Sequence, residues 1–189
     1  MTARGLSKNL IVKEAMGIAE KDGATAVTMA TLAKRLAIKP PSLYNHFKSL
    51  DEIKKAVAIA ALYEFLHWLE EKMVSNVSGK EAIHALSKAY VAFAQEHPGK
   101  YDCSFLAPNP LDQEVQTAGE GIVQLTMKTL SDFPLDDVEK VHIVRGLRSL
   151  LHGLVDLDRK GGFQLSVNLE ESREVIVETY VRGLEKFDL

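Results

Sequence analysis

The stretch VTMATLAKRLAIKPPSLYNHFKSLDEI, residues 27–53, decides the fold of this chain. Thr28 is a typical helix N-cap residue, so a short helix is predicted to begin there. A turn over residues 37–39 follows, and Pro40 takes the first position of a second helix, where the amide hydrogen that proline lacks would have had no partner. The second helix is only about seven residues long and must be held by packing. Two short helices joined in this way predict a helix-turn-helix.

The second of these helices has two chemically different faces. Leu43 and Phe47 stand four residues apart, so both are predicted to face inward. The outward side is short and polar, made of Ser42, Asn45 and His46, with Tyr44 at its edge. In the major groove an asparagine pairs with adenine, whereas serine and tyrosine hydroxyls donate to phosphates. The alternatives are that Tyr44 packs against the preceding helix and that His46 is a solvated surface residue.

Helical periodicity continues through the rest of the chain, and no segment alternates as a strand. A helix is predicted over residues 7–21, with Gly23 as a left-handed terminator, and another begins at a Ser49–Glu52 capping box and runs to Val74. Further helices are expected over residues 78–97, 99–106, 112–131, 136–160 and 169–187. The sequence therefore predicts an all-α fold of about nine helices.

Composition places the chain among folded, water-soluble proteins, because 46% of its residues are hydrophobic and 26% are charged. No apolar run approaches the roughly 18 residues of a membrane span, and the first residues lack a signal-peptide core. The single cysteine, Cys103, excludes an internal disulfide framework. We therefore expect a cytoplasmic protein that is not associated with a membrane.

The net charge of −3 conceals a gradient along the chain. Residues 1–55 contain ten lysines and arginines and five acids, whereas the rest contains 13 basic and 21 acidic residues. A basic head on an acidic body is expected when only the head faces phosphate. The alternative is a chance fluctuation of surface charge.

The segment 27–53, with its LYNHF element and the capped helix after it, resembles the TetR/AcrR family of bacterial repressors. The resemblance implies a helix-turn-helix DNA-binding domain over residues 1–48 and a ligand-binding and dimerisation domain over residues 49–189. It also implies a flexible arm in which Arg4 reaches DNA. The DNA contacts expected from the resemblance and from position are Thr28, Lys39, Pro40, Ser42, Tyr44, Asn45, His46 and Lys48.

Two departures from the family pattern bear on this head. Family members usually carry glycine where this chain has Ala37, so the turn is expected to avoid a left-handed φ angle there. They also commonly carry lysine where this chain has Leu50, so Lys48 or Lys54 is expected to take over the phosphate contact.

The last two long helices are expected to form the surface between two copies of the chain. The segment RGLRSLLHGLVDLDRKGGF is similar to a TetR C-terminal class with a His-Gly pair in this helix, and family members pair these helices as a four-helix bundle. Glycine in a helix costs up to ~1 kcal/mol, so the glycines there indicate close helix approach. The expected dimer residues are Gly146, Gly153, Val177, Tyr180, Val181 and Leu184. The alternative is that the apolar stripe of the last helix covers only its own core.

Aromatic side chains gather where family members hold their ligand. The expected pocket residues are Phe65, Trp68, Tyr90, Phe93, Tyr101, Phe105 and His152. A largely apolar cavity with few polar groups selects hydrophobic or aromatic ligands. The alternative for each aromatic residue is an ordinary core position, and His152 and His142 could be satisfied helix histidines.

These observations predict a homodimeric transcriptional repressor that binds a palindromic operator in double-stranded DNA and is released by a small hydrophobic or aromatic effector. The helix that begins at residue 49 would link the pocket to the head. The alternative is a helical adaptor or ligand-binding protein that has lost DNA binding. An enzyme, a cofactor and a metal site are not expected, because Cys103 has no base at a motif spacing and no HExxH or CxxC pattern occurs.

Overall fold

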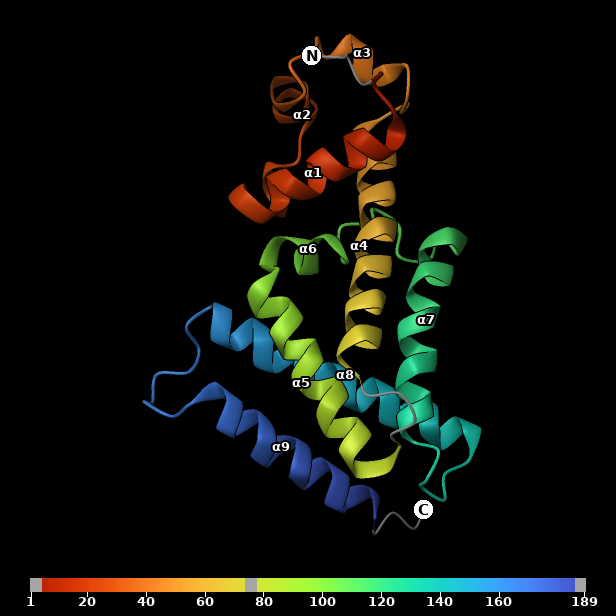
Figure 1. Cartoon of the computed structure of the whole chain (residues 1–189), viewed down its shortest axis with the longest axis vertical. Helices are drawn as coiled ribbons and strands as arrows, with labels where there is room; N and C mark the ends of the chain where they lie inside the picture. The colour runs from red at the N-terminus through yellow and green to blue at the C-terminus, as the bar shows by residue number, and fades with distance from the viewer. Residues whose placement is uncertain (1–4, 74–77, 186–189) are drawn as a thin grey trace. The chain divides into compact units, whose positions relative to one another are not determined.

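The computed structural model describes residues 5–73 and 78–185. Within them the chain forms nine α-helices and one short 3₁₀-helix, with no strand (Figure 1), so the all-α prediction is confirmed. The elements in order are α1 (Lys8–Asp22), η1 (Ala24–Ala26), α2 (Met29–Arg35), α3 (Pro41–Tyr44), α4 (Leu50–Lys72), α5 (Gly79–Glu96), α6 (Pro98–Cys103), α7 (Gln113–Thr129), α8 (Asp137–Arg159) and α9 (Leu169–Leu184). Predictions that fell on Arg4, Val74 and Phe187 lie outside the described residues. No helix in the described ranges is both long and apolar enough to cross a membrane.

Local capping explains where several helices begin. The Ser7 hydroxyl accepts a hydrogen bond from Leu10 N (3.2 Å) at the start of α1, and the Asp136 carboxylate accepts two from backbone amides at the start of α8. Gly23 ends α1 with a φ of 88° and a ψ of 155°. The positive φ favours glycine, but the ψ lies outside the left-handed helical conformation expected for it.

The second helix of the helix-turn-helix is shorter than predicted. It covers only Pro41–Tyr44, and Pro40 is its N-cap and not its first residue. The flanking turns close with hydrogen bonds three residues apart, from Ser42 N to Lys39 O (2.9 Å) and from His46 N to Leu43 O (2.9 Å). Such tight turns at both ends leave one turn of regular α-helix between them.

Ala37 contradicts the prediction that the turn avoids left-handed backbone, because its φ angle is +54°. Ala37 N donates to Lys34 O (3.2 Å) and Ile38 N donates to Ala33 O (3.0 Å). These two bonds are those of a Schellman motif, which ends a helix by placing one residue in the left-handed region. The geometry that ends α2 therefore requires a left-handed residue, a conformation that glycine adopts more readily than alanine.

The chain divides into two compact units. The first unit comprises residues 1–65 and 96–120, and the second comprises residues 66–95 and 121–189. The predicted functional boundary between residues 48 and 49 stays a prediction.

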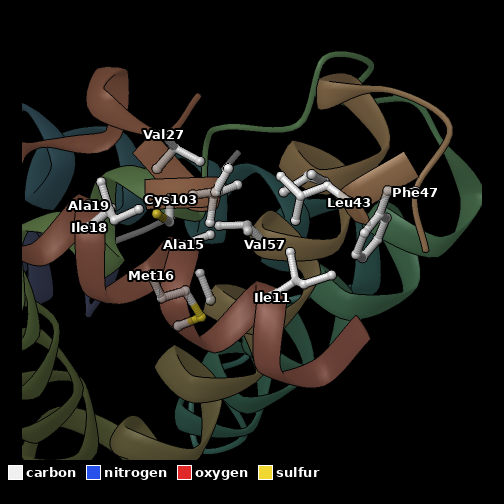
Figure 2. Close-up of a cluster of buried hydrophobic side chains, with 14 residues drawn as sticks. Ile11, Ala15, Met16, Ile18, Ala19, Val27, Leu43, Phe47, Val57 and Cys103 are labelled. Atoms are coloured by element: carbon white, nitrogen blue, oxygen red, sulfur yellow. The ribbon is translucent and has the colours of Figure 1, made fainter. Parts of the chain in front are cut away.

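The first unit has a core made by α1, α2, α3, α4 and α6. Figure 2 shows this core, in which Leu43 and Phe47 belong to the same buried cluster as Ile11 and Val57. Cys103, from α6, is fully buried in that cluster although it lies far along the chain. The core of the first unit thus includes a segment from the middle of the sequence, α6, in addition to the N-terminal helices.

Helix α6 approaches the backbone of α1 closely. A Cβ atom added to Gly99 would lie 2.3 Å from Ala19 C and from Glu20 Cα, so only glycine fits there. Lys100 N also donates to the Glu20 carboxylate (2.9 Å). Helix α6 is therefore in direct backbone contact with the first helix of the head.

The second unit is held by contacts among α5, α8 and α9. Glu178 of α9 pairs with Lys80 of α5 (2.9 Å) and lies 3.2 Å from Nε2 of His84, also on α5. Tyr180 donates its hydroxyl hydrogen to Ile143 O of α8 (2.7 Å). Charged contacts thus join α9 to α5, while the half-buried Tyr180 joins it to α8.

Candidate nucleic-acid interface

Helices α2 and α3 form the predicted helix-turn-helix, and the two faces of α3 differ as expected. Leu43 and Phe47 have 0% and 3% of their surface exposed, whereas Tyr44 is 56% exposed. Asn45 is also exposed. The inward prediction for the two apolar residues is confirmed, and Tyr44 does not pack into the core.

The remaining predicted DNA-contact residues surround this helix. Lys39 and Pro40, at its N-terminal end, are exposed, and so is Lys48 just after it. Ser42 and His46 are half-buried. The structure thus places seven of the eight predicted contacts on or next to α3, at the N-terminal end, the outer side and the following turn.

Thr28, the eighth, is half-buried at the start of α2, where it caps the helix. Its hydroxyl oxygen accepts a hydrogen bond from Thr31 N (3.1 Å), and Thr28 N donates to Thr31 Oγ1 (3.0 Å). Thr31 Oγ1 also donates to Ala26 O (2.6 Å). Sequence reasoning missed Thr31, because capping boxes usually carry Glu or Gln at that position.

Most lysines of residues 5–55 form no ion pair, although the first unit as a whole contains 11 basic and 11 acidic residues. Arg35 pairs with Glu14 (2.6 Å), Lys100 with Glu64 (2.8 Å), and Lys55 with both Asp112 (2.8 Å) and Glu114 (2.6 Å). No ion pair within 4.0 Å to another described residue is formed by Lys8, Lys13, Lys21, Lys34, Lys39, Lys48 or Lys54. Unneutralised lysines on one unit are suited to binding a polyanion.

Lys55, in contrast to these lysines, forms ion pairs with two acidic residues of the first unit. Hydrogen bonds to Asp112 and Glu114 raise the pKa of Lys55, and the bond to Lys55 lowers the pKa of Asp112. The charge of Lys55 is therefore already neutralised by two carboxylates. Leu50, where family members carry lysine, is half-buried and offers no charge.

The predicted pocket residues divide between the two units. In the first unit, Tyr101 lies between Phe65 (centroids 6.0 Å apart) and Phe105 (5.4 Å), both in edge-on contact. Phe65 and Tyr101 are buried, whereas Phe105 is exposed.

In the second unit, Trp68 lies 5.9 Å from Phe93 and donates its indole N–H to Ala89 O (2.9 Å). Tyr90 is buried and His152 is half-buried. The role of both groups in a ligand pocket stays a prediction.

The predicted dimer residues lie mostly inside the protomer. Val177, Val181 and Leu184 are buried in it, which agrees with the alternative that this stripe covers its own core. Gly146 lies under Tyr180, because a Cβ added there would be 2.6 Å from the Tyr180 hydroxyl. A Cβ added to Gly153, by contrast, would meet nothing within 4 Å.

Part of the surface of α8 and α9 is open to solvent and includes the predicted dimer residues Tyr180 and Leu184. It forms a shallow hollow of about 510 Å³ lined by Ile143, Leu150, Val175, Ile176, Thr179, Tyr180, Gly183 and Leu184. Val175, on this face, is 66% exposed. Sequence reasoning missed most of these residues, because α9 carries apolar side chains on two sides and periodicity alone does not rank them.

The single cysteine of the chain, Cys103, is not placed to act as a catalytic nucleophile. Cys103 is fully buried, and burial raises its pKa to about 12, so it is not a ready nucleophile. No group of three or more potential metal ligands occurs within the described ranges.

A lysine-rich segment with an outward-facing polar helix after a tight turn is typical of a helix-turn-helix DNA-binding protein. The model for "Bacterial regulatory proteins, tetR family" matches residues 11–57, and the model for "Tetracyclin repressor-like, C-terminal domain" matches residues 83–180. The uncharacterised HTH-type transcriptional regulator YobS of Bacillus subtilis (strain 168) is 34% identical over 95% of this chain and 93% of its own length. The chain belongs to the TetR family of transcriptional regulators, which is not a family of enzymes.

Solved structures show the same fold. A protein of unknown function from Rhodococcus sp. RHA1 is similar with a TM-score of 0.80 at 21% identity, over 97% of each chain. BioQ bound to its natural double-stranded DNA operator is similar with a TM-score of 0.70 at 20% identity, over 97% of this chain and 100% of BioQ. These likenesses show that the chain shares one fold with both proteins over nearly its whole length.

Proposed function

We propose that this regulator is a cytoplasmic repressor that binds a palindromic DNA operator as a homodimer and leaves it when a small hydrophobic or aromatic effector binds. The observation that carries the proposal is that α3 and the residues beside it have a buried apolar side and an exposed polar side. Leu43 and Phe47 are buried, so Tyr44 and Asn45 are left exposed on a short helix. A helix with that polar outer side fits the major groove.

Each outward residue has a distinct proposed role. Asn45 and Ser42 read base edges, and Tyr44 and His46 contact the backbone beside them. Lys39 and Pro40, at the N-terminal end of α3, enter the groove. Family members commonly carry lysine at the position of Leu50, and in this chain Lys48 makes the phosphate contact instead. Thr28 adds a contact at the start of α2.

Dimerisation is proposed to use the open face of α8 and α9. The hollow there is lined mostly by apolar side chains, and Gly153 has free space around it. Two copies related by a twofold axis would present two α3 helices to half-sites about 34–36 Å apart, or a multiple of that spacing. Sedimentation equilibrium tests this assembly: Val175→Glu is expected to convert a dimer into a monomer.

Effector response is proposed to reach the head through α4 and α6. Helix α4 is continuous from Leu50 to Lys72, and its residues belong to both units. Tyr101 and Gly99, both on α6, contact the aromatic cluster and the α1 backbone respectively. The dimer is proposed to have two arrangements that differ in the distance between its two helix-turn-helix units, and only one of them matches the spacing of the operator half-sites. An effector releases DNA only if it binds more tightly to the arrangement that does not match.

Binding to DNA duplexes tests the central proposal. Selection from random duplexes, and the flank upstream of the protein's own gene, would supply a sequence that the wild type binds selectively. The double variant Tyr44→Ala/Asn45→Ala is expected to lose that selectivity while keeping its thermal stability, because neither side chain is in the core.

Tyr63→Ala is a matched control, since Tyr63 is 51% exposed in the same unit but lies on α4. Selective binding that survives the double variant would contradict the proposed roles. A wild type with no affinity for any duplex would favour the adaptor alternative.

A further inference from the structure

Lys8 occupies a position beside the helix-turn-helix that the sequence pattern does not single out. It is the first residue of α1, and its Nζ lies 5.1 Å from the centre of the Phe47 ring. Phe47 is buried just after α3, whereas Lys8 is exposed. Figure 1 shows the start of α1 beside the turn between α3 and α4. The amino group of Lys8 is therefore held close to the C-terminal end of α3.

The Phe47 ring limits where this amino group can go. A cation over an aromatic face is attracted by the ring's quadrupole. A lysine on a helix surface otherwise samples many rotamers, and binding a ligand would have to order them. Because Phe47 is fixed in the core, it orients Lys8 before any ligand arrives.

The charge of Lys8 is not neutralised by the protein. No described carboxylate lies within ion-pair distance of it, and the same holds for Lys48, the residue that follows Phe47. Lys55, further along α4, shows the contrast, because it already pairs with two carboxylates. Two lysines without an ion pair therefore neighbour the buried Phe47: Lys8 through its amino group over the ring, and Lys48 as the next residue in the chain.

We propose that Lys8 is a DNA-backbone contact whose amino group Phe47 positions to bind a phosphate beside the groove that α3 enters. This inference rests on the proposed DNA-binding function and adds a residue from α1 to it. Phosphates are the same at every base pair, so Lys8 contributes affinity without sequence selectivity.

The salt dependence of binding tests this role directly. A mixed-sequence duplex a few helical turns long is titrated at several salt concentrations with the wild type, Lys8→Ala and Lys8→Arg. The logarithm of the DNA-binding constant falls with the logarithm of the salt concentration, and each phosphate contact contributes about 0.9 to the steepness of that fall. A dimer of Lys8→Ala loses two such contacts, so its slope is expected to be less steep by about 1.8. Lys8→Arg keeps the charge and is expected to keep the slope.

Two further variants separate a DNA contact from simple packing. Lys21→Ala removes an exposed, unpaired lysine from the other end of α1 and is expected to leave the slope unchanged. Phe47→Leu keeps the Lys8 charge but removes the ring, and is expected to weaken binding less than Lys8→Ala does.

An unchanged slope for Lys8→Ala, even with a lower melting temperature, would show that Lys8 only packs on Phe47 and would overturn this inference. In that case the proposed function stands, provided that the wild type binds. A wild type that does not bind the duplex overturns both.

Discussion

At the scale of single residues, Ala37 carries the one positive φ angle of a non-glycine residue in the described part of the chain. Holding an L-residue there costs about 1–2 kcal/mol, while glycine loses roughly 0.5–1 kcal/mol of extra entropy on folding. We therefore expect Ala37→Gly to raise the free energy of unfolding by about 0.5–1 kcal/mol and the melting temperature by about 1–4 °C. Calorimetry measures this, and a lower melting temperature would contradict the strain argument.

Gly146 offers a residue-scale test whose sign depends on its neighbour. Gly146→Ala places a Cβ 2.6 Å from the Tyr180 hydroxyl and is expected to cost about 1–3 kcal/mol. In a Tyr180→Phe background the nearest remaining atom is Cζ at 3.4 Å, so the same substitution is expected to stabilise by up to ~1 kcal/mol through helix propensity. A double-mutant cycle by denaturant unfolding measures both values, and equal penalties in the two backgrounds would refute the contact.

At the scale of elements, the contact of α6 with α1 depends on Gly99. Gly99→Ala would place its Cβ 2.3 Å from backbone atoms of Ala19 and Glu20, which cannot swing aside like a side-chain tip. We expect a loss of about 1–3 kcal/mol in stability, despite the gain in helix propensity. Thermal unfolding measures the loss, with Gly119→Ala on α7 as a control, since a Cβ there would meet nothing within 4 Å. Equal stability of the two variants would mean that α6 moves freely away from α1.

Element boundaries show which parts of the fold the sequence can predict. The N-termini of α1, α2 and α8 were predictable because Ser7, Thr28 and Asp136 cap them through bonds within a few residues. The length of α3 and the φ angle of Ala37 were not, because packing between helices sets them. The polar side of α3 was predictable from Leu43 and Phe47, whereas α9 has two apolar sides and only the folded chain distinguishes them.

At the scale of the whole molecule, Glu178 makes the attachment of α9 to α5 depend on pH. Hydrogen bonds from Lys80, Arg182 and His84 lower its pKa from 4.5 to about 2. A lowered carboxyl pKa stabilises the fold above the unfolded value, so this contribution is present above about pH 4.5 and is lost as pH falls towards 2. Glu178→Gln is therefore expected to lower the melting temperature at neutral pH and to match the wild type near pH 2. A constant difference at every pH would contradict this linkage.

The burial of Cys103 among side chains of α1 and α2 has a consequence for how the protein is made. A ribosome delivers α1 to α4 first, yet their shared interior lacks its closing piece until α6 has been synthesised. The nascent head therefore has to wait, with part of its apolar surface uncovered, while the intervening α5 emerges. Binding to DNA during translation is thus postponed until the middle of the chain has been added.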